Sequence, residues 1–134
     1  MGPEELPRYR SAWFALGWLL VLGVAVGSFL PSLPQVSAGV SDKLMHFAAY
    51  ATLAFLFMGA AGRRHWLSIG LGLLALGGVV EVLQATLSST RSGEWLDMAA
   101  NAAGVTGGIL AAGAFPSNWC RQLELLAGAG GVRR

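Results

Sequence analysis

The apolar residues of this chain are gathered into four long blocks, and this pattern constrains the fold more than any other feature. The blocks are residues 13–30, 44–61, 66–87 and 95–115, and the charged residues lie mostly between them. About 18 or more apolar residues, wound into a helix, can cross the ~30 Å hydrocarbon layer of a membrane. Four such spans in 134 residues leave no room for a separate soluble domain. We therefore expect an all-α integral membrane protein, a four-transmembrane-helix bundle forming one domain over residues 1–134.

The first block has one feature of a secretory signal, because Arg8 and Arg10 precede it. It is long, however, and it ends in the residues PSLPQ instead of a small-x-small cleavage site. We interpret it as a retained span.

Basic residues are distributed unevenly over the two sides of such a bundle. Both termini and the loop between the second and third spans share one side, which holds Arg8, Arg10, Arg63, Arg64, Arg121, Arg133 and Arg134. The other side holds Lys43 and Arg91. Because basic residues in short loops tend to stay in the cytoplasm, we predict that both termini are cytoplasmic and that loops 31–43 and 88–94 face outward. The tail, residues 116–134, is predicted to begin with an interfacial amphipathic piece and to end disordered.

Small residues are unusually frequent, with 19 glycines in the chain. In membrane helices, small residues allow two backbones to approach closely, and dispersion then favours association. The pairs Gly23–Gly27 and Gly104–Gly108 have the spacing of such contacts, so we predict that both lie at helix–helix interfaces. The single cysteine, Cys120, rules out an internal disulfide, and we expect it to be a small apolar residue at a helix end.

Six strongly polar residues interrupt the apolar blocks, near the outward ends of their spans. They are His46 and Tyr50 in the second span, Glu81 and Gln84 in the third, and Asp97 and Asn101 in the fourth. At a rise of ~1.5 Å per residue, each lies within about 12 Å of the outer surface. At ~100° per residue, the polar residues of each span also share one face of their helix.

An ionisable group at membrane depth costs about 2.5–3.5 kcal/mol, so His46, Glu81 and Asp97 are not expected to face lipid separately. We expect them to turn toward one another and to line an outward-opening polar pocket shared by the second, third and fourth helices. Asp42, Lys43 and Arg91 would lie near its rim.

Two other interpretations of these residues stay open. In a purely structural network, Glu81 or Asp97 pairs with Lys43 or Arg91, and His46 only hydrogen bonds Glu81 or Asn101. A metal site formed by His46, Glu81 and Asp97 is the less favoured of the two, because one histidine with scattered carboxylates has no ligand-spacing signature. We therefore predict no metal and no other cofactor.

The segments SDKLMHFAAYATLAF, EVLQ, Arg91 and LDMAANAAGVTGG, in this order, resemble the VanZ-like family of small bacterial membrane proteins. That family typically shows D-K-x-x-H-F-x-x-Y, then E-x-x-Q, a basic residue, and D-x-x-x-N-x-x-G. The matching positions lie between Ser41 and Gly108: Asp42, Lys43, His46, Phe47, Tyr50, Glu81, Gln84, Arg91, Asp97, Asn101 and Gly104. The namesake of the family is linked to resistance to the glycopeptide antibiotic teicoplanin. The resemblance implies action at the bacterial cell envelope, in the inner membrane, and supplies no settled reaction.

Three functions are compatible with these residues. The first is binding or modulation of an envelope lipid or a lipid-linked cell-wall precursor, with the ligand-binding residues Asp42, Lys43, His46, Tyr50, Glu81, Gln84, Arg91, Asp97 and Asn101. The second is a hydrolase or transferase acting on such a lipid, with His46 as general base and Glu81 or Asp97 fixing its tautomer. The third is a proton or ion path, which we favour least because the inner half of the bundle lacks polar groups. Membrane lipids are the expected partners, nucleic acid is not, and the oligomeric state stays open.

Overall fold

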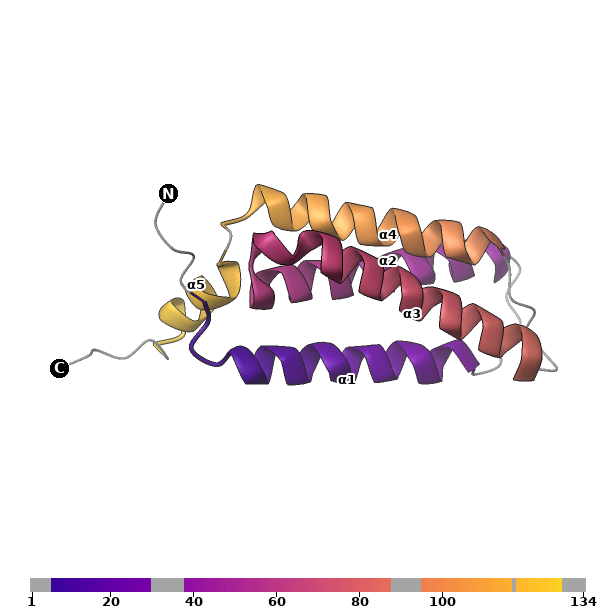
Figure 1. Ribbon diagram of the computed structural model, residues 1–134, viewed down its shortest axis with the longest axis horizontal. Coiled ribbons are helices and arrows are strands. Elements are labelled where there is room, and N and C mark those ends of the chain that lie inside the picture. The colour runs from indigo at the N-terminus through magenta and orange to yellow at the C-terminus, as the bar shows by residue number, and fades with distance from the viewer. Residues whose placement is uncertain (1–5, 30–37, 88–94, 117, 129–134) are drawn as a thin grey trace.

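The computed structural model describes residues 6–29, 38–87, 95–116 and 118–128, and all of the secondary structure in these ranges is helical. Four long helices form a bundle, and a short fifth helix lies across one end of it (Figure 1). The helices are α1 (Arg10–Phe29), α2 (Ala38–Ala61), α3 (Trp66–Leu87), α4 (Trp95–Ala114) and α5 (Trp119–Leu126), with a 3-10 turn η1 (Arg63–His65) before α3. The predicted all-α class and the four long helices are confirmed.

Three of the long helices are long and apolar enough to cross a membrane on their own: α1, α2 from Asp42 onward, and the segment Arg63–Leu87. Helix α4 meets this criterion only together with α5. Asp97 and Asn101 lower the hydropathy of α4, which explains the difference. The described part of the chain therefore has three helices, or up to four, of transmembrane length and composition.

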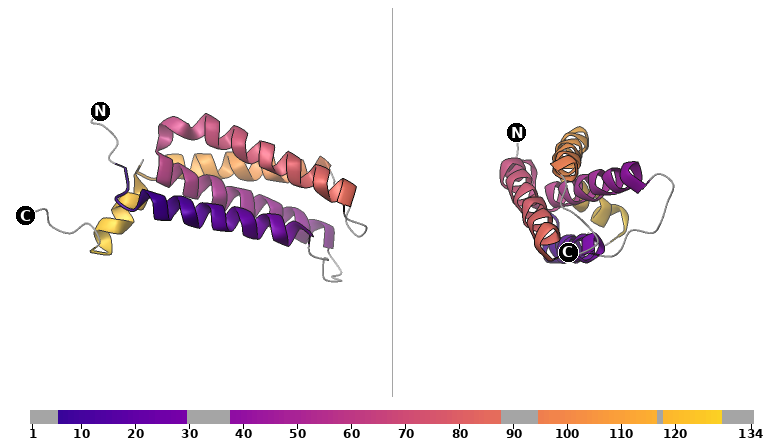
Figure 2. Two further views of the ribbon diagram at one scale, coloured as in Figure 1. Left: turned by 60° about the horizontal axis from the view of Figure 1, so that its bottom comes forward. Right: turned by 90° about the vertical axis from the view of Figure 1, so that its right-hand side faces the viewer.

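Helix α2 forms the centre of the bundle. Of its apolar span, 56% is buried, against 17% for α1 and 28% for the segment with α3. Tyr50, Leu53, Ala54 and Phe57 of α2 make one core cluster with Val21, Leu73 and Val105 from the other three long helices. Seen end-on, α1 and α4 lie on opposite sides of the bundle (Figure 2). Large apolar side chains cover the outside, among them Trp18, Leu19, Met45, Val82 and Leu110, as expected for a lipid-facing surface.

The closest helix contact joins α2 to α4 through two glycines. A Cβ atom at Gly104 would collide with the carbonyl oxygen of Phe47, and one at Gly108 would collide with the carbonyl oxygen of Ala51. The backbones of the two helices therefore touch, and the predicted role of this glycine pair in packing is confirmed.

The corresponding prediction for Gly23 and Gly27 is wrong within this chain. A Cβ atom at either position would meet nothing within 4 Å. Both glycines instead line a cavity between α1 and α2.

The turn from α2 into α3 places a basic side chain at the end of another helix. Gly62 adopts a φ of 88°, a conformation that favours glycine, and the chain then enters η1. From this turn, Arg63 Nη2 donates hydrogen bonds to the carbonyl oxygens of Gly113 and Phe115 at the C-terminal end of α4. A cation at this end of a helix is favourable because the terminal carbonyls carry partial negative charge.

Helix α5 packs against the end of the bundle through aromatic side chains. The ring of Trp119 stacks on Phe55 with a centroid separation of 4.7 Å, and it meets Trp13 edge-on at 5.9 Å. Gly59 makes this possible, because any side chain there would collide with the Trp119 ring. Cys120 is fully buried beside it, as predicted, and burial together with the nearby Glu124 charge raises the pKa of its thiol to about 12. A thiol with so high a pKa is a poor nucleophile at neutral pH.

The carboxylate of Glu124 connects α5 to the start of α1. Its oxygens accept hydrogen bonds from the backbone N–H groups of Arg8 (2.7 Å) and Tyr9 (3.0 Å) and from the indole N–H of Trp13 (2.8 Å). The two backbone N–H groups lie at the start of α1, where no intrahelical acceptor is available to them, and the indole N–H adds a side-chain donor from the first turn. Glu124 thus acts as a cap for α1, supplied from 115 residues away.

We expect acid to release this cap. Burial of Glu124 opposes ionisation, but the hydrogen bonds from Tyr9, Trp13 and Arg8 and the charge of Arg121 outweigh it, so the pKa of this carboxyl lies below its ordinary value of 4.5. A lowered pKa in the folded state contributes stability above pH 4.5 that is lost as the pH falls through the lowered value. The Trp13 indole N–H resonance of micelle-bound protein, followed by NMR, should therefore shift as the pH falls from 5 to 3. In Glu124→Gln this acid transition should be absent; identical pH profiles for the two proteins would contradict the prediction.

Candidate functional site

The first half of α2 carries four polar side chains toward the other helices. Asp42 and Lys43 belong to this helix, which begins at Ala38, and not to the preceding loop as predicted. His46 and Tyr50 follow at helical spacing and are 8% and 1% exposed. Since α2 and α4 run in the same direction, the start of α2 lies beside the start of α4, and two pairs of side chains meet there across the helices.

The outer pair is an ion pair. Lys43 Nζ lies 2.7 Å from Asp97 Oδ1, and the two side chains are 28% and 7% exposed. A carboxylate as buried as Asp97 is costly without a cation, because desolvation penalises the charge. Lys43 compensates this cost, and its ammonium stays partly accessible.

The inner pair is a buried hydrogen bond. His46 Nδ1 lies 2.9 Å from the side-chain oxygen Oδ1 of Asn101, which is 1% exposed. An amide oxygen can only accept, so Nδ1 carries the hydrogen, and Nε2 is the basic nitrogen of a neutral His46. Lys43 with Asp97 and His46 with Asn101 are two of the pairings that the purely structural interpretation of the sequence offered, and the structure contains both.

The third helix approaches the same point through Gly77. A Cβ atom there would lie 3.0 Å from Asn101 Nδ2 and 3.3 Å from the phenol oxygen of Tyr50. That oxygen is buried and has no hydrogen-bond partner in the part of the chain that the structure describes. Buried polar atoms without a partner are uncommon. Packing alone therefore does not explain why this position carries a tyrosine with a buried hydroxyl group. Glu81, one helical turn beyond Gly77, is 7% exposed and lies within electrostatic range of Tyr50.

Gln84 makes a contact between two helices. Its side-chain nitrogen Nε2 donates a 2.5 Å hydrogen bond to the backbone carbonyl of Ser28, in the last turn of α1. This contact joins α3 to α1 and satisfies a carbonyl that the helix end leaves without an intrahelical donor. Gln84 is 3% exposed, and its side-chain amide is used in this helix–helix contact; its predicted part in ligand binding stays a prediction.

A cavity of about 320 Å³ adjoins this polar cluster. Asp42, His46, Met45 and Ala49 of α2 form one wall, and the other wall comes from α1: Leu20, Gly23, Val24, Gly27 and Ser28. We predicted a hollow between the second, third and fourth helices. In the structure, Tyr50 and Asn101 of that region are each 1% exposed, and the cavity beside His46 opens toward α1. It is polar at Asp42 and His46 and apolar along most of α1.

Among the described residues, the side chains of Asp42, His46 and Asp97 form a group that could hold a cation. Each offers one ligand atom, and these atoms lie within 4.8 Å of one another. The set contains Asp42 in place of the Glu81 that the sequence suggested. Because the Lys43 ammonium already lies 2.7 Å from Asp97, a metal ion would have to compete with it for this carboxylate.

The described residues thus bring together Lys43 with Asp97 and His46 with Asn101, with Asp42, Tyr50 and Glu81 beside them. Arg91 lies outside the described residues. Sequence reasoning missed the contribution of α1, which resembles no motif. The glycine pair Gly23–Gly27 was the sequence signal on α1, but its spacing indicated close packing and not an open space.

A scan against protein-family models gave no match, and neither a curated protein nor a solved structure is significantly similar to this chain.

Proposed function

We propose that this chain is a VanZ-like protein of the bacterial inner membrane that binds or modulates an envelope lipid or a lipid-linked cell-wall precursor. The observation that carries the proposal is the cavity beside His46, which combines a polar end with an apolar wall. A lipid-linked ligand has the same division, with a polar head and a hydrocarbon chain. Most ligand sites likewise combine apolar walls with a few polar groups that fix orientation.

The polar head would lie against Asp42 and His46, and the hydrocarbon chain would follow Leu20 and Val24 along α1. Lys43 supports recognition of a phosphate or carboxylate, because its ammonium has three donors and its side chain stays 28% exposed beside Asp97. In the same proposal Arg91 supplies a second cation. A connection to teicoplanin resistance would follow only from the family resemblance.

The distribution of charge supports an outward position for this cavity. Arg8, Arg10, Arg63, Arg64 and Arg121 lie at the end of the bundle where α1 begins and α2 ends, and Lys43 lies at the opposite end. By the positive-inside rule, the arginine-rich end is cytoplasmic, which places both termini inside. The cavity would then open in the leaflet that faces the periplasm or the cell exterior.

Binding of a fluorescent polyprenyl phosphate to protein in nanodiscs tests this proposal. Gly23→Leu adds a side chain at a position that lines the cavity and whose Cβ would meet nothing within 4 Å. We expect about tenfold weaker binding, or ~1.4 kcal/mol, in this variant. Gly113→Leu, which also projects into open space but lies outside the cavity, is the matched control and should bind normally. Equal binding by all three proteins would refute the proposal.

A hydrolase or transferase is the second candidate, and the His46–Asn101 hydrogen bond favours it. This contact leaves Nε2 as the basic nitrogen, in a side chain that lines the cavity. Such a nitrogen can take a proton from an attacking water or hydroxyl group. Phosphate release from a polyprenyl pyrophosphate by purified protein would test for turnover, and His46→Ala should then lower the rate by at least about 100-fold. Binding without turnover would leave the binding function and exclude this reaction.

A further inference from the structure

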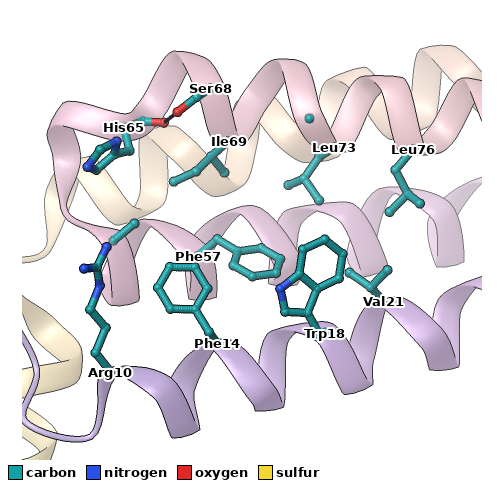
Figure 3. Close-up of a pocket in the computed structure, with 12 residues that line it drawn as sticks. Arg10, Phe14, Trp18, Val21, Phe57, His65, Ser68, Ile69, Leu73 and Leu76 are labelled. Atoms are coloured by element: carbon teal, nitrogen blue, oxygen red, sulfur yellow. Dashed lines mark hydrogen bonds between the residues drawn. The ribbon is translucent and has the colours of Figure 1, made fainter.

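A second cavity lies at the arginine-rich end of the bundle, away from the polar cluster. It is a groove of about 370 Å³ between α1 and α3, with α2 as its floor. Phe14, Trp18 and Val21 of α1 face Ile69, Leu73 and Leu76 of α3 across it, and the ring of Phe57 lies beneath them (Figure 3). The floor lies close to α1 because Gly17 has no side chain; a Cβ there would be 2.7 Å from the Phe57 ring.

Polar groups occur at one end of this groove. Arg10, His65 and Ser68 lie there, and the lining beyond them is apolar (Figure 3). The guanidinium carbon of Arg10 lies 5.3 Å from the centroid of the Phe14 ring, and Arg10 Nε is buried with no hydrogen-bond partner among the described residues. Arg64 Nε donates to His65 Nε2 at 2.9 Å, so the Nδ1 of a neutral His65 carries its hydrogen. This end therefore offers a cation and N–H donors.

The length of the groove matches half a bilayer. Along α1 it runs from Arg10 to Val21, and on the other side from His65 of η1 to Leu76 of α3. The ends of each range are eleven helical steps apart, which at ~1.5 Å per step is about 16 Å. The hydrocarbon layer is ~30 Å thick, so the groove extends through about one leaflet. One acyl chain of a phospholipid has this reach, with its phosphate at the membrane surface.

We propose that this groove binds an anionic phospholipid, with one acyl chain between α1 and α3 and the phosphate against Arg10 and His65. The apolar walls exclude a free inorganic anion as the main occupant. The positive charges of Arg10 and Arg64 both lie at the polar end of the groove, where the negatively charged phosphate would bind. The site is separate from the cavity beside His46, so it does not depend on the function proposed for that cavity.

Gly72 provides the sharpest test, because it lines the groove and its Cβ position has nothing within 4 Å. Gly72→Leu should place a side chain in the groove without disturbing the helices. Gly113→Leu, on α4 and outside the groove, is the matched control. Circular dichroism and size-exclusion chromatography establish that each variant is folded. Arg10→Gln leaves the groove open and removes the charge, and Arg10→Lys keeps the charge.

Native mass spectrometry of the full chain with phosphatidylglycerol, phosphatidylcholine or inorganic phosphate gives the readout. We expect phosphatidylglycerol to bind in preference to phosphatidylcholine, with about tenfold weaker binding in Gly72→Leu and normal binding in Gly113→Leu. Arg10→Gln should lose about fivefold of the preference for the anionic lipid, and Arg10→Lys should retain it. Unchanged phosphatidylglycerol binding in Gly72→Leu would overturn the proposal, as would equal binding of the two lipids. Displacement of phosphatidylglycerol by inorganic phosphate would also overturn it, because the acyl chain would then contribute nothing.

Discussion

Gly108→Leu is expected to separate α2 from α4 and to lower the free energy of unfolding by about 3 kcal/mol or more. The Cβ position of Gly108 collides with the carbonyl oxygen of Ala51, and it also lies 2.8 Å from the Ala54 side chain. A backbone oxygen cannot change rotamer, so α2 itself would have to move. Since α2 forms the centre of the bundle, this movement would disturb the core cluster around Tyr50 and Phe57. Unfolding in detergent micelles, followed by circular dichroism, measures the loss.

The matched control for this prediction is Gly113→Leu, five residues further along the same helix. It adds the same side chain where nothing lies within 4 Å, so stability should change by less than about 0.5 kcal/mol. If both leucine variants unfolded at the wild-type denaturant concentration, the backbone contact between α2 and α4 would not be a determinant of stability.

The second large effect is expected at the ion pair of Lys43 and Asp97. Lys43→Met leaves the Asp97 carboxylate buried without its cation, and breaking a buried pair in this way costs about 3–5 kcal/mol. Because Lys43 is 28% exposed, we expect a loss near 3 kcal/mol, at the lower end of this range. Denaturant unfolding in micelles provides the measurement.

The double variant Lys43→Met with Asp97→Val separates the pair from its isolated charge. Removing both charged groups eliminates the desolvation cost, so the double variant should be more stable than Lys43→Met alone. A double variant that is less stable than the single one would show that Asp97 has a further partner that Lys43 does not explain. Equal stability of Lys43→Met and the wild type would contradict the prediction directly.

Much of the polar cluster could be predicted, because helical geometry determines how deep each side chain lies in the membrane and which face of its helix it occupies. His46, Asn101, Lys43 and Asp97 were expected at the same end of the bundle, and they meet there in two pairs. Periodicity could not decide between Asn101 and Glu81 as the partner of His46. That choice depends on how far α3 is rotated and on the approach permitted by Gly77.

The contribution of α1 could not be predicted, for a physical reason. Helices in a membrane associate through shape and a few hydrogen bonds, and an apolar helix such as α1 gives no directional signal in its sequence. The contact of Gln84 with the carbonyl of Ser28 and the cavity lined by Gly23 and Gly27 both follow from the position of α1. The glycine spacing of α1 indicated close packing, whereas the space beside these glycines is open.

The cap that Glu124 provides for α1 has a consequence for biogenesis. Ribosomes add about 5–20 residues per second, so roughly 6–23 s pass between the synthesis of Tyr9 and that of its acceptor. During this interval the first helix is already made while its leading amide groups lack the carboxylate that binds them in the finished protein. Closure of this end of the bundle is therefore a late event in the making of these helices, because it waits until synthesis has passed Glu124.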